Sequence, residues 1–252
     1  MTIQTASKRP DSLKPMEQPD KLGPISAWSY SALKVFEDCA YRSYISRVKK
    51  IQEPGSAAMD RGTTIHEEAE HYVDGSGEFT DNLKKFKSEF EELRQLYIEA
   101  KVELEGDWGF TLDWKPTGWT VPDTWARIKL DALVHEDQTS ARVIDYKTGR
   151  KFGNELAHSQ QMLLYAIAAF MRFEDLEFVT AELWYLDKGE TTVRTFTREE
   201  AMEFLPGYHS RAIRMTTAEE FDPNPSKYNC KWCSYKETPE GHDGPQCQWG
   251  IT

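Results

Sequence analysis

The sequence predicts an α/β fold in which a central mixed sheet is flanked by helices. Two observations support this fold class. Segments with alternating apolar residues, which indicate strands, are interspersed with segments of helical periodicity. The 252 residues are 39% apolar and 12% aromatic, enough for one large domain or two small ones. We expect a single domain.

The first part of the chain is predicted to be a tail followed by a helix. Residues 1–24 mix Pro, Lys, Asp and Ser with few apolar residues, which predicts a mobile tail before a domain that spans 25–252. Hydroxyl groups within 26–31 can cap a helix that carries Leu33 and Phe36 on one face.

The segment 41–50 interleaves aromatic and basic residues. Such a pattern suits contact with a strand of nucleic acid, because rings stack on bases and cations bind phosphates. The alternative is a set of core aromatic residues with Lys and Arg pointing outward.

A helix with His66 near its start is expected next. Thr64 and Glu67 have the spacing of a capping box, which places His66 in the first turn beside the buried stripe. Without other signals, such a histidine is more often a core or capping residue than a metal ligand. A second amphipathic helix is predicted over 81–99.

Two strands joined by a polar loop form the most informative part of the sequence. The segments 127–134 and 143–147 indicate strands, and the loop between them indicates a hairpin. If the hairpin is symmetric about Gln138, Asp131 lies opposite Asp145, with Cβ atoms about 4.5–5.5 Å apart. Another strand is expected within 101–114.

The predicted hairpin brings two carboxylates and an ammonium together. Asp145 and Lys147 project from the same face of their strand, and Asp131 faces Asp145. Two close carboxylates repel unless a cation lies between them, and hard oxygen ligands suit Mg²⁺ or Mn²⁺. The alternative is a surface hairpin with an ordinary ion pair.

The remaining elements alternate in the same way. A helix over 155–173 places Gln161 and Tyr165 on one face, four residues apart. Strands are expected over 178–186 and 191–196, followed by a helix from Thr197 to Met215 with a break at Pro206. The face of the helix that carries Gln161 and Tyr165 either has a polar function near the hairpin or is the ordinary polar edge of an amphipathic helix.

Charge and hydropathy exclude some classes of protein. A net charge of −11 argues against a general nucleic-acid coat protein, but it allows a local basic groove. The absence of a long apolar window predicts a soluble, cytoplasmic protein without a membrane partner. Candidate DNA contacts are the basic residues of two clusters: Arg42, Arg47, Lys49, Arg150 and Lys151.

Taken in order, His66, Asp131, Asp145-Tyr146-Lys147 and Gln161 with Tyr165 resemble the RecB-like branch of the PD-(D/E)XK nuclease superfamily. The resemblance covers residues 25 to 250. It looks most like the stand-alone phage or CRISPR-associated type, and it implies a restriction-endonuclease-like core with a helical N-terminal part.

The resemblance implies a role for each residue of the set. His66, Asp131, Asp145 and the Tyr146 carbonyl would bind the metal. Lys147 would orient or deprotonate the attacking water, Gln161 would steady that water, and Tyr165 would pack against a nucleotide. The metal would activate the water and neutralise charge on the phosphate.

Four cysteines indicate a second metal site. An even count with a Cys-x-x-Cys pair points to metal in a reducing compartment; the residues are Cys39, Cys230, Cys233 and Cys247. The resemblance implies a [4Fe–4S] cluster that staples the segment 222–252 to the first helix. The rival is structural Zn²⁺, bound by four cysteines or by three with His242.

The expected function is therefore Mg²⁺- or Mn²⁺-dependent hydrolysis of DNA. The protein would be an exonuclease on single strands or duplex ends, in DNA recombination, repair or phage DNA metabolism. Encoding by a phage, with action in the host cytoplasm, fits this expectation. The alternative is a nucleic-acid-binding or scaffold module of the same fold without catalysis. A redox protein is a third reading, which would use the cysteines.

Overall fold

A six-stranded mixed sheet forms the centre of the computed structural model, which describes residues 16–149, 152–237 and 244–251. The strand order is β2-β1-β3-β4-β5-β6, and only β4 and β5 run parallel to one another among the described pairs. The strands are β1 (Val102–Phe110), β2 (Pro116–Thr117), β3 (Ala126–His135), β4 (Ser140–Lys147), β5 (Phe178–Tyr185) and β6 (Glu190–Thr197).

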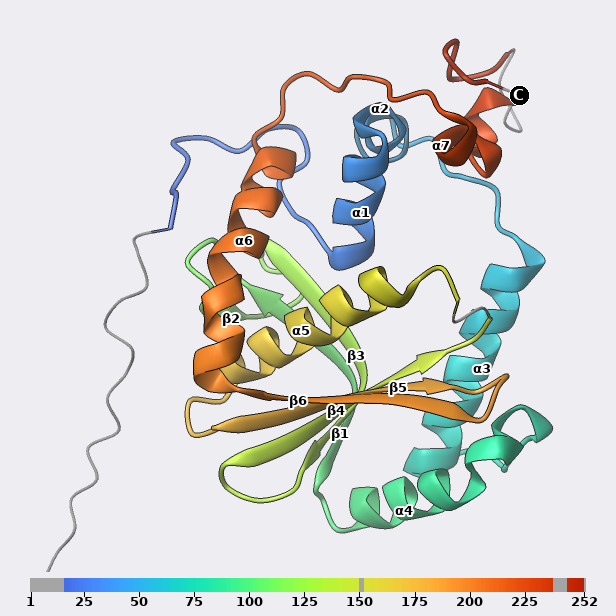
Figure 1. Cartoon of the computed structure of the whole chain (residues 1–252), viewed down its shortest axis with the longest axis vertical. Coiled ribbons are helices and arrows are strands. Elements are labelled where there is room, and N and C mark those ends of the chain that lie inside the picture. The colour runs from blue at the N-terminus through green and yellow to red at the C-terminus, as the bar shows by residue number, and fades with distance from the viewer. Residues whose placement is uncertain (1–15, 150–151, 238–243, 252) are drawn as a thin grey trace, which may run out of the picture.

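Helices lie on both faces of this sheet and above one of its ends (Figure 1). They are α1 (Tyr30–Asp38), α2 (Ala40–Ser43), the π-helix η1 (Tyr44–Val48), α3 (Ala57–Asp74), the 3-10 helix η2 (Asp81–Phe86), α4 (Lys87–Ile98), α5 (Glu155–Arg172), α6 (Arg198–Thr216), α7 (Lys227–Lys231) and the 3-10 helix η3 (Ser234–Lys236). The predicted fold class is confirmed, including the helical N-terminal part.

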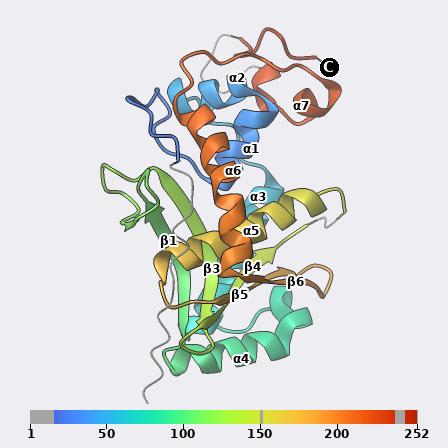
Figure 2. The same cartoon turned by 60° about the vertical axis from the view of Figure 1, so that its left-hand side comes forward.

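The sheet separates two apolar cores. The first core lies under α1, α5 and α6, and α5 supplies nine consecutive buried residues to it. The second core lies between the sheet and α3 and α4. Figure 2 shows α6 running from the level of the sheet up to the part that carries α1 and α2. Burial on both faces holds β4 between two helical layers.

The β3–β4 hairpin has the predicted register. Ala132 pairs with Ile144, and Leu133 pairs with Val143. Continuing this register by one residue places Asp131 opposite Asp145, as the symmetry of the loop predicts. The Tyr146 N–H donates to the Asp131 carboxylate at 2.5 Å, so Asp131 is tied to the neighbouring strand.

The alternation of buried side chains reverses along β1 and β3. Within β1, Val102 belongs to the second core and Trp108 to the first. Within β3, Leu130 belongs to the first core and Ala132 to the second, although all four residue numbers are even. Strict period-two alternation would place them on the same face. Glu105 has a φ of 47°, in the left-handed region that a glutamate rarely adopts, and it lies where β1 reverses.

Two helix boundaries differ from the sequence-based expectation. The helix with His66 begins at Ala57, capped by Ser56, instead of at the Thr64 capping box. Thr64 donates its hydroxyl to the carbonyl of Asp60, so His66 lies in the third turn. Helix α6 is continuous through Pro206, so the break expected there is wrong.

The C-terminal segment packs against the helical part near α2 (Figures 1 and 2). The Tyr235 hydroxyl donates to the carbonyl of Ile51 at 2.6 Å, and Tyr41 and Trp249 meet edge to face at 4.8 Å. These contacts join residues 184 and 208 positions apart in the sequence. Tyr41 therefore packs against the C-terminal segment, and contact of the segment 41–50 with nucleic acid stays a prediction.

Part of the predicted N-terminal tail touches the core. Residues 1–15 lie outside the described part of the chain. Leu22 packs against the first core, and the Gly23 N–H donates to the carbonyl of Thr216 at 2.7 Å. Among the described residues, no helix has the length and apolar content needed to cross a membrane.

Candidate active site

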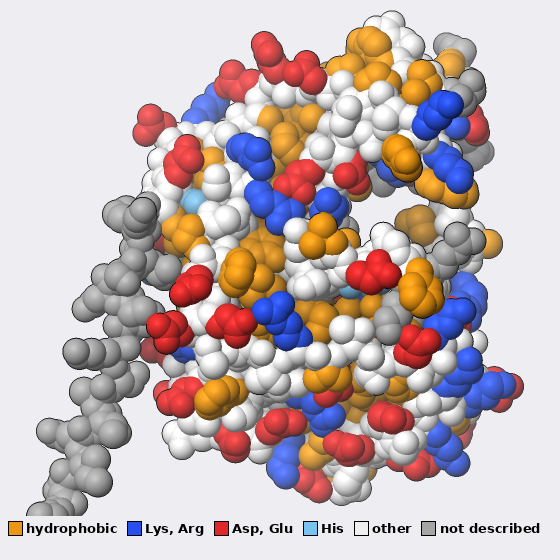
Figure 3. Space-filling view, in the orientation of Figure 1, with side chains coloured by type: hydrophobic (Ala, Val, Ile, Leu, Met, Phe, Trp, Pro, Cys, Tyr) orange, Lys and Arg blue, Asp and Glu red, His pale blue; other side chains and the backbone are white. Residues whose placement is uncertain are grey.

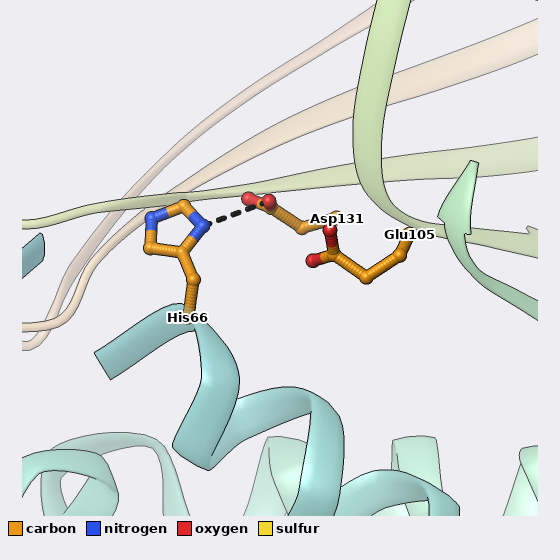
Figure 4. A group of neighbouring side chains, drawn as sticks. All are labelled: His66, Glu105 and Asp131. Carbon is orange, nitrogen blue, oxygen red and sulfur yellow. Dashed lines mark hydrogen bonds and ion pairs between the residues drawn. The ribbon is translucent and has the colours of Figure 1, made fainter. Parts of the chain in front are cut away.

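Three potential metal donors from three elements meet beside the sheet (Figure 4). His66 comes from α3, Glu105 from β1 and Asp131 from β3, and one ligand atom of each lies within 4.8 Å of the other two. His66 Nδ1 and Asp131 Oδ1 are 2.9 Å apart. His66 and Asp131, which were both predicted to bind one metal ion, therefore lie side by side, and their binding of metal stays a prediction.

Sequence reasoning missed Glu105. This residue lies opposite Asp131 in the β1–β3 register, between the pairs Leu104–Ala132 and Gly106–Leu130. The strand before the hairpin was expected, and pairing it with β3 would have matched these two acids. The alternation reverses at this position, so a count of faces along β1 gave no signal for it.

A closed ring of polar contacts surrounds Asp145. Lys147 Nζ lies 2.5 Å from Asp145 Oδ2 and donates to Gln161 Oε1 at 2.8 Å. Gln161 Nε2 donates to the Tyr165 hydroxyl at 2.6 Å, and that hydroxyl donates to Asp145 Oδ1 at 2.7 Å. Because β4 and α5 each supply two members, the i+2 and i+4 spacings read from the sequence converge on one site.

The Tyr165 hydroxyl is placed to hold the Asp145 carboxylate in position. Its side chain is 5% exposed, which leaves little ring surface for a nucleotide to stack on. Burial raises the pKa of Tyr165 well above its ordinary value, so the hydroxyl keeps its proton and donates to Asp145. Stacking on a nucleotide stays a prediction from the resemblance.

Burial and charge oppose one another at the His66–Asp131 pair. Burial raises the pKa of Asp131, and the hydrogen bond from His66 offsets only part of this effect. Burial is the largest single influence on His66 and lowers its pKa, but the hydrogen bond to Asp131 and the negative charges of the nearby carboxylates together outweigh burial, so the pKa of His66 is raised overall. Two carboxylates and a histidine held this closely favour a cation among them.

A cavity of about 720 Å³ opens beside these groups. His66, Asp131, Gln161 and Tyr165 line it. The cavity volume falls within the usual range for small-molecule sites, and its wall combines aromatic, acidic and basic side chains. The metal donors therefore face a space large enough for a small molecule.

The candidate DNA contacts have different environments. Arg42 is bound by Glu53 through two hydrogen bonds, of 2.5 and 2.6 Å, and Lys49 lies 5.7 Å from the ring centre of Tyr44. Arg47 lines the cavity. Arg150 and Lys151 lie outside the described residues, so their predicted contacts stay predictions.

The four cysteines line one small cavity of about 20 Å³ between α2 and the C-terminal segment. Cys39 lies at the junction of α1 and α2; the other three are Cys230, Cys233 and Cys247. The Asn224 N–H donates to Cys39 Sγ at 3.4 Å. The predicted rival ligand His242 lies outside the described residues.

Comparison with known families decides the classification of the chain. The family model of the PD-(D/E)XK nuclease superfamily matches residues 27–121 and 125–238. The chain belongs to the PD-(D/E)XK nuclease superfamily. No curated protein matches the sequence of this superfamily member.

The solved structures that are similar to this PD-(D/E)XK chain include the following three. The crystal structure of SSO0001 is 14% identical, with 92% of this chain and 91% of that chain covered and a TM-score of 0.45. The alkaline exonuclease LHK-Exo from Laribacter hongkongensis is 13% identical, with 75% and 87% covered and a TM-score of 0.39. LHK-Exo in complex with dAMP gives the same values.

A further contact in this PD-(D/E)XK fold fixes the chain beyond Lys147. Asp187 follows β5, binds Arg61 through two hydrogen bonds of 2.6 and 3.0 Å, and accepts from the Gly149 N–H at 3.0 Å. The loop after β4 is thereby joined to α3 and β5. A Cβ at Gly62 would lie 3.2 Å from Thr148 Oγ1, so α3 also approaches this loop closely.

Proposed function

We propose that this protein is a Mg²⁺- or Mn²⁺-dependent deoxyribonuclease that hydrolyses phosphodiester bonds. The observation that carries the proposal is the meeting of the His66, Glu105 and Asp131 donors with the ring around Asp145 in a PD-(D/E)XK chain. The substrate class is DNA, and recombination, repair or phage DNA metabolism would use such an activity.

The donor set fits a hard divalent ion. Two carboxylates and one imidazole converge, and such oxygen-rich sites suit Mg²⁺ or Mn²⁺. We propose that His66, Asp131, Asp145 and the Tyr146 carbonyl bind it, with Glu105 as an additional ligand. The ion would supply Lewis-acid stabilisation of the phosphate and a more acidic bound water.

Lys147 acts on the attacking water and on the phosphate. Its ammonium is held between Asp145 and Gln161, at 2.5 and 2.8 Å, so it keeps one orientation. From this position the ammonium orients the water and offsets negative charge that develops on the phosphate, whereas deprotonation of the water would require Lys147 to lose its own proton first. Gln161, whose amide bridges Lys147 and Tyr165, would steady that water.

We propose exonuclease action on single strands or duplex ends. Figure 3 shows an opening between the helical part and the core of the fold, next to the segment that joins η1 to α3. A single strand can thread such an opening from a free end, whereas a closed circle cannot. Linear single-stranded DNA should be degraded while circular single-stranded DNA of the same sequence resists, and equal cleavage of both would exclude a need for ends.

The decisive test of catalysis removes the charge of Asp145 and the charge of Lys147 in separate variants. Asp145→Asn and Lys147→Met should abolish cleavage of labelled single-stranded DNA in Mn²⁺, because each removes a charge from the ring. Lys87→Met, on the exposed surface of α4, is the matched control and should cleave normally. Retained cleavage by both site variants would refute the proposal. DNA binding by the wild type without any cleavage would favour the alternative of a binding or scaffold module.

We propose that the four cysteines bind a [4Fe–4S] cluster, with structural Zn²⁺ as the rival. Support comes from their shared cavity and from an N–H donor at Cys39, which is typical of thiolate ligands. A broad visible absorbance band and stoichiometric iron in anaerobically purified protein would support the cluster. Zinc in its place, without that band, would overturn it. Cys233→Ala should lose the bound metal.

A further inference from the structure

Two arginines face the cavity that holds the metal donors. Arg47 comes from the π-helix η1, and Arg127 comes from β3, four residues before Asp131. They are close enough that the charge of Arg127 adds to the effect of burial in lowering the pKa of Arg47. A π-helix is rare and often marks a functional site. The chain thus brings two like charges together at the wall of the candidate active site.

These arginines have no acidic partner within the described chain. Arg42 and Arg61 are each paired with a carboxylate, and Lys129 binds Glu105 at 2.6 Å. No carboxylate lies within 4.0 Å of Arg47 or Arg127 among the described residues. Two adjacent cations without a counterion repel, and an anion between them removes that cost.

Arg127 is already oriented toward a ligand. Its Nε donates to the carbonyl of Trp119 at 3.0 Å, and its guanidinium lies 5.8 Å from the centre of the Trp119 ring. This anchoring restricts the side chain while its terminal nitrogens keep their donors. Trp119 also lines the cavity, so an aromatic surface lies beside the two cations. That combination is typical of sites for single-stranded nucleic acid.

We propose that Arg47 and Arg127 form a phosphate-binding subsite that holds the DNA strand beside the scissile bond. This inference rests on the proposed nuclease function. Planar guanidinium groups bind phosphate oxygens in a bidentate manner, which a lysine does not reproduce. The Trp119 ring stacks on a base next to the bound phosphate. The phosphate belongs either to the strand interior or to its terminus.

Binding without cleavage tests the subsite directly. Arg47→Gln and Arg127→Gln are made in an Asp145→Asn background, and fluorescence anisotropy measures their affinity for labelled oligo-dT in metal-free buffer. We expect the dissociation constant to rise about tenfold for each variant, since one charged contact is lost. The slope of log K against log salt should become shallower by about 0.7 per lost contact.

Two controls separate a loss of binding from a loss of structure. Arg194→Gln removes an arginine of β6 that is paired with Glu200 of α6, and this variant should bind as the parent does. Arg127→Lys keeps the charge but loses the bidentate geometry, so it should restore only part of the affinity. Equal thermal unfolding midpoints for parent and variants establish that each protein is folded.

Two substrate arms distinguish the sources of the phosphate. If the subsite holds a terminal phosphate, the arginine variants lose affinity only for 5′- or 3′-phosphorylated oligonucleotides. If the subsite holds an internal phosphate, the variants lose affinity for hydroxyl-ended strands too. Replacing the contacted phosphate by an uncharged methylphosphonate should then make the parent and the variants bind equally. Either result supports the subsite.

The subsite is overturned if folded Arg47→Gln and Arg127→Gln bind every oligonucleotide as the parent does, with an unchanged salt slope. This outcome is distinct from failure of the nuclease proposal. That proposal fails if the unmodified protein does not cleave DNA in Mn²⁺, whereas the subsite is judged by binding alone. In the active protein, the same substitutions should raise KM and leave kcat within about twofold.

Discussion

Removing the charge of Glu105 should weaken metal binding, although sequence patterns did not indicate this residue. Its carboxylate lies within 4.8 Å of the donor atoms of His66 and Asp131. A unit charge at that distance interacts with another by about 3.5 kcal/mol at an effective dielectric constant of 20. A divalent ion among the three donors would therefore gain substantially from Glu105.

Two features reduce this gain. Lys129 binds Glu105 at 2.6 Å and already neutralises part of its charge. The Glu105 side chain is also 21% exposed, so solvent screens it. We therefore expect Glu105→Gln to cost about 1.5–2 kcal/mol of metal-binding free energy, which corresponds to a dissociation constant that is roughly 10–30-fold larger.

Isothermal titration of Mn²⁺ into metal-stripped protein measures this loss. Glu103→Gln is the matched control, because Glu103 lies two residues earlier on β1 and pairs with His135 instead. Asp131→Asn should lose more affinity than Glu105→Gln, since Asp131 is also bonded to His66. If Glu105→Gln binds Mn²⁺ like the wild type while Asp131→Asn fails, Glu105 is not a ligand and the reasoning is wrong.

Three other perturbations address the surroundings of this site. Tyr165→Phe keeps the ring but removes the donor to Asp145, so kcat should fall about tenfold with little change in thermal stability, as steady-state kinetics and melting curves will show. Asp187→Asn weakens the anchor of the loop after β4, so calorimetry should show a Tm lower by about 2–4 °C, for a loss near 1 kcal/mol. The raised pKa of His66 means that metal must displace a proton, so Mn²⁺ affinity should rise up to about tenfold per pH unit below that pKa and level off above it; His66→Asn should flatten this dependence in calorimetric titrations. A wild-type affinity that is constant from pH 6 to pH 9 would contradict the last prediction.

Local periodicity was sufficient to predict the elements that carry the ring around Asp145. The polar loop at Gln138 fixed the hairpin register, because a symmetric loop leaves one pairing that keeps both apolar faces buried. The four-residue spacing of Gln161 and Tyr165 placed both side chains on the face of α5 that meets β4. These relations involve few residues, so short-range rules describe them.

Other parts of the site depend on long-range geometry. Glu105 approaches Asp131 because the alternation reverses in β1 and β3 together, and no pattern within either strand indicates that reversal. Arg127 was seen only as a strand residue, since its proximity to Arg47 requires the helical part to be in place. The predicted start of α3 was wrong because Ser56, not Thr64, caps the helix. The Thr64 hydroxyl instead donates to the carbonyl of Asp60 inside the helix.

The reversal of alternation explains how one site draws on both helical layers. His66 comes from α3, which packs on the second core, whereas Gln161 and Tyr165 come from α5, which packs on the first. A regular sheet would keep these layers apart, because each side chain would face one of them. Asp131 lies at the crossing point and binds both His66 and the backbone of β4, so it connects the metal donors to the ring around Asp145. Loss of this carboxylate should therefore disturb both halves of the site, whereas loss of Glu105 should disturb only the metal half.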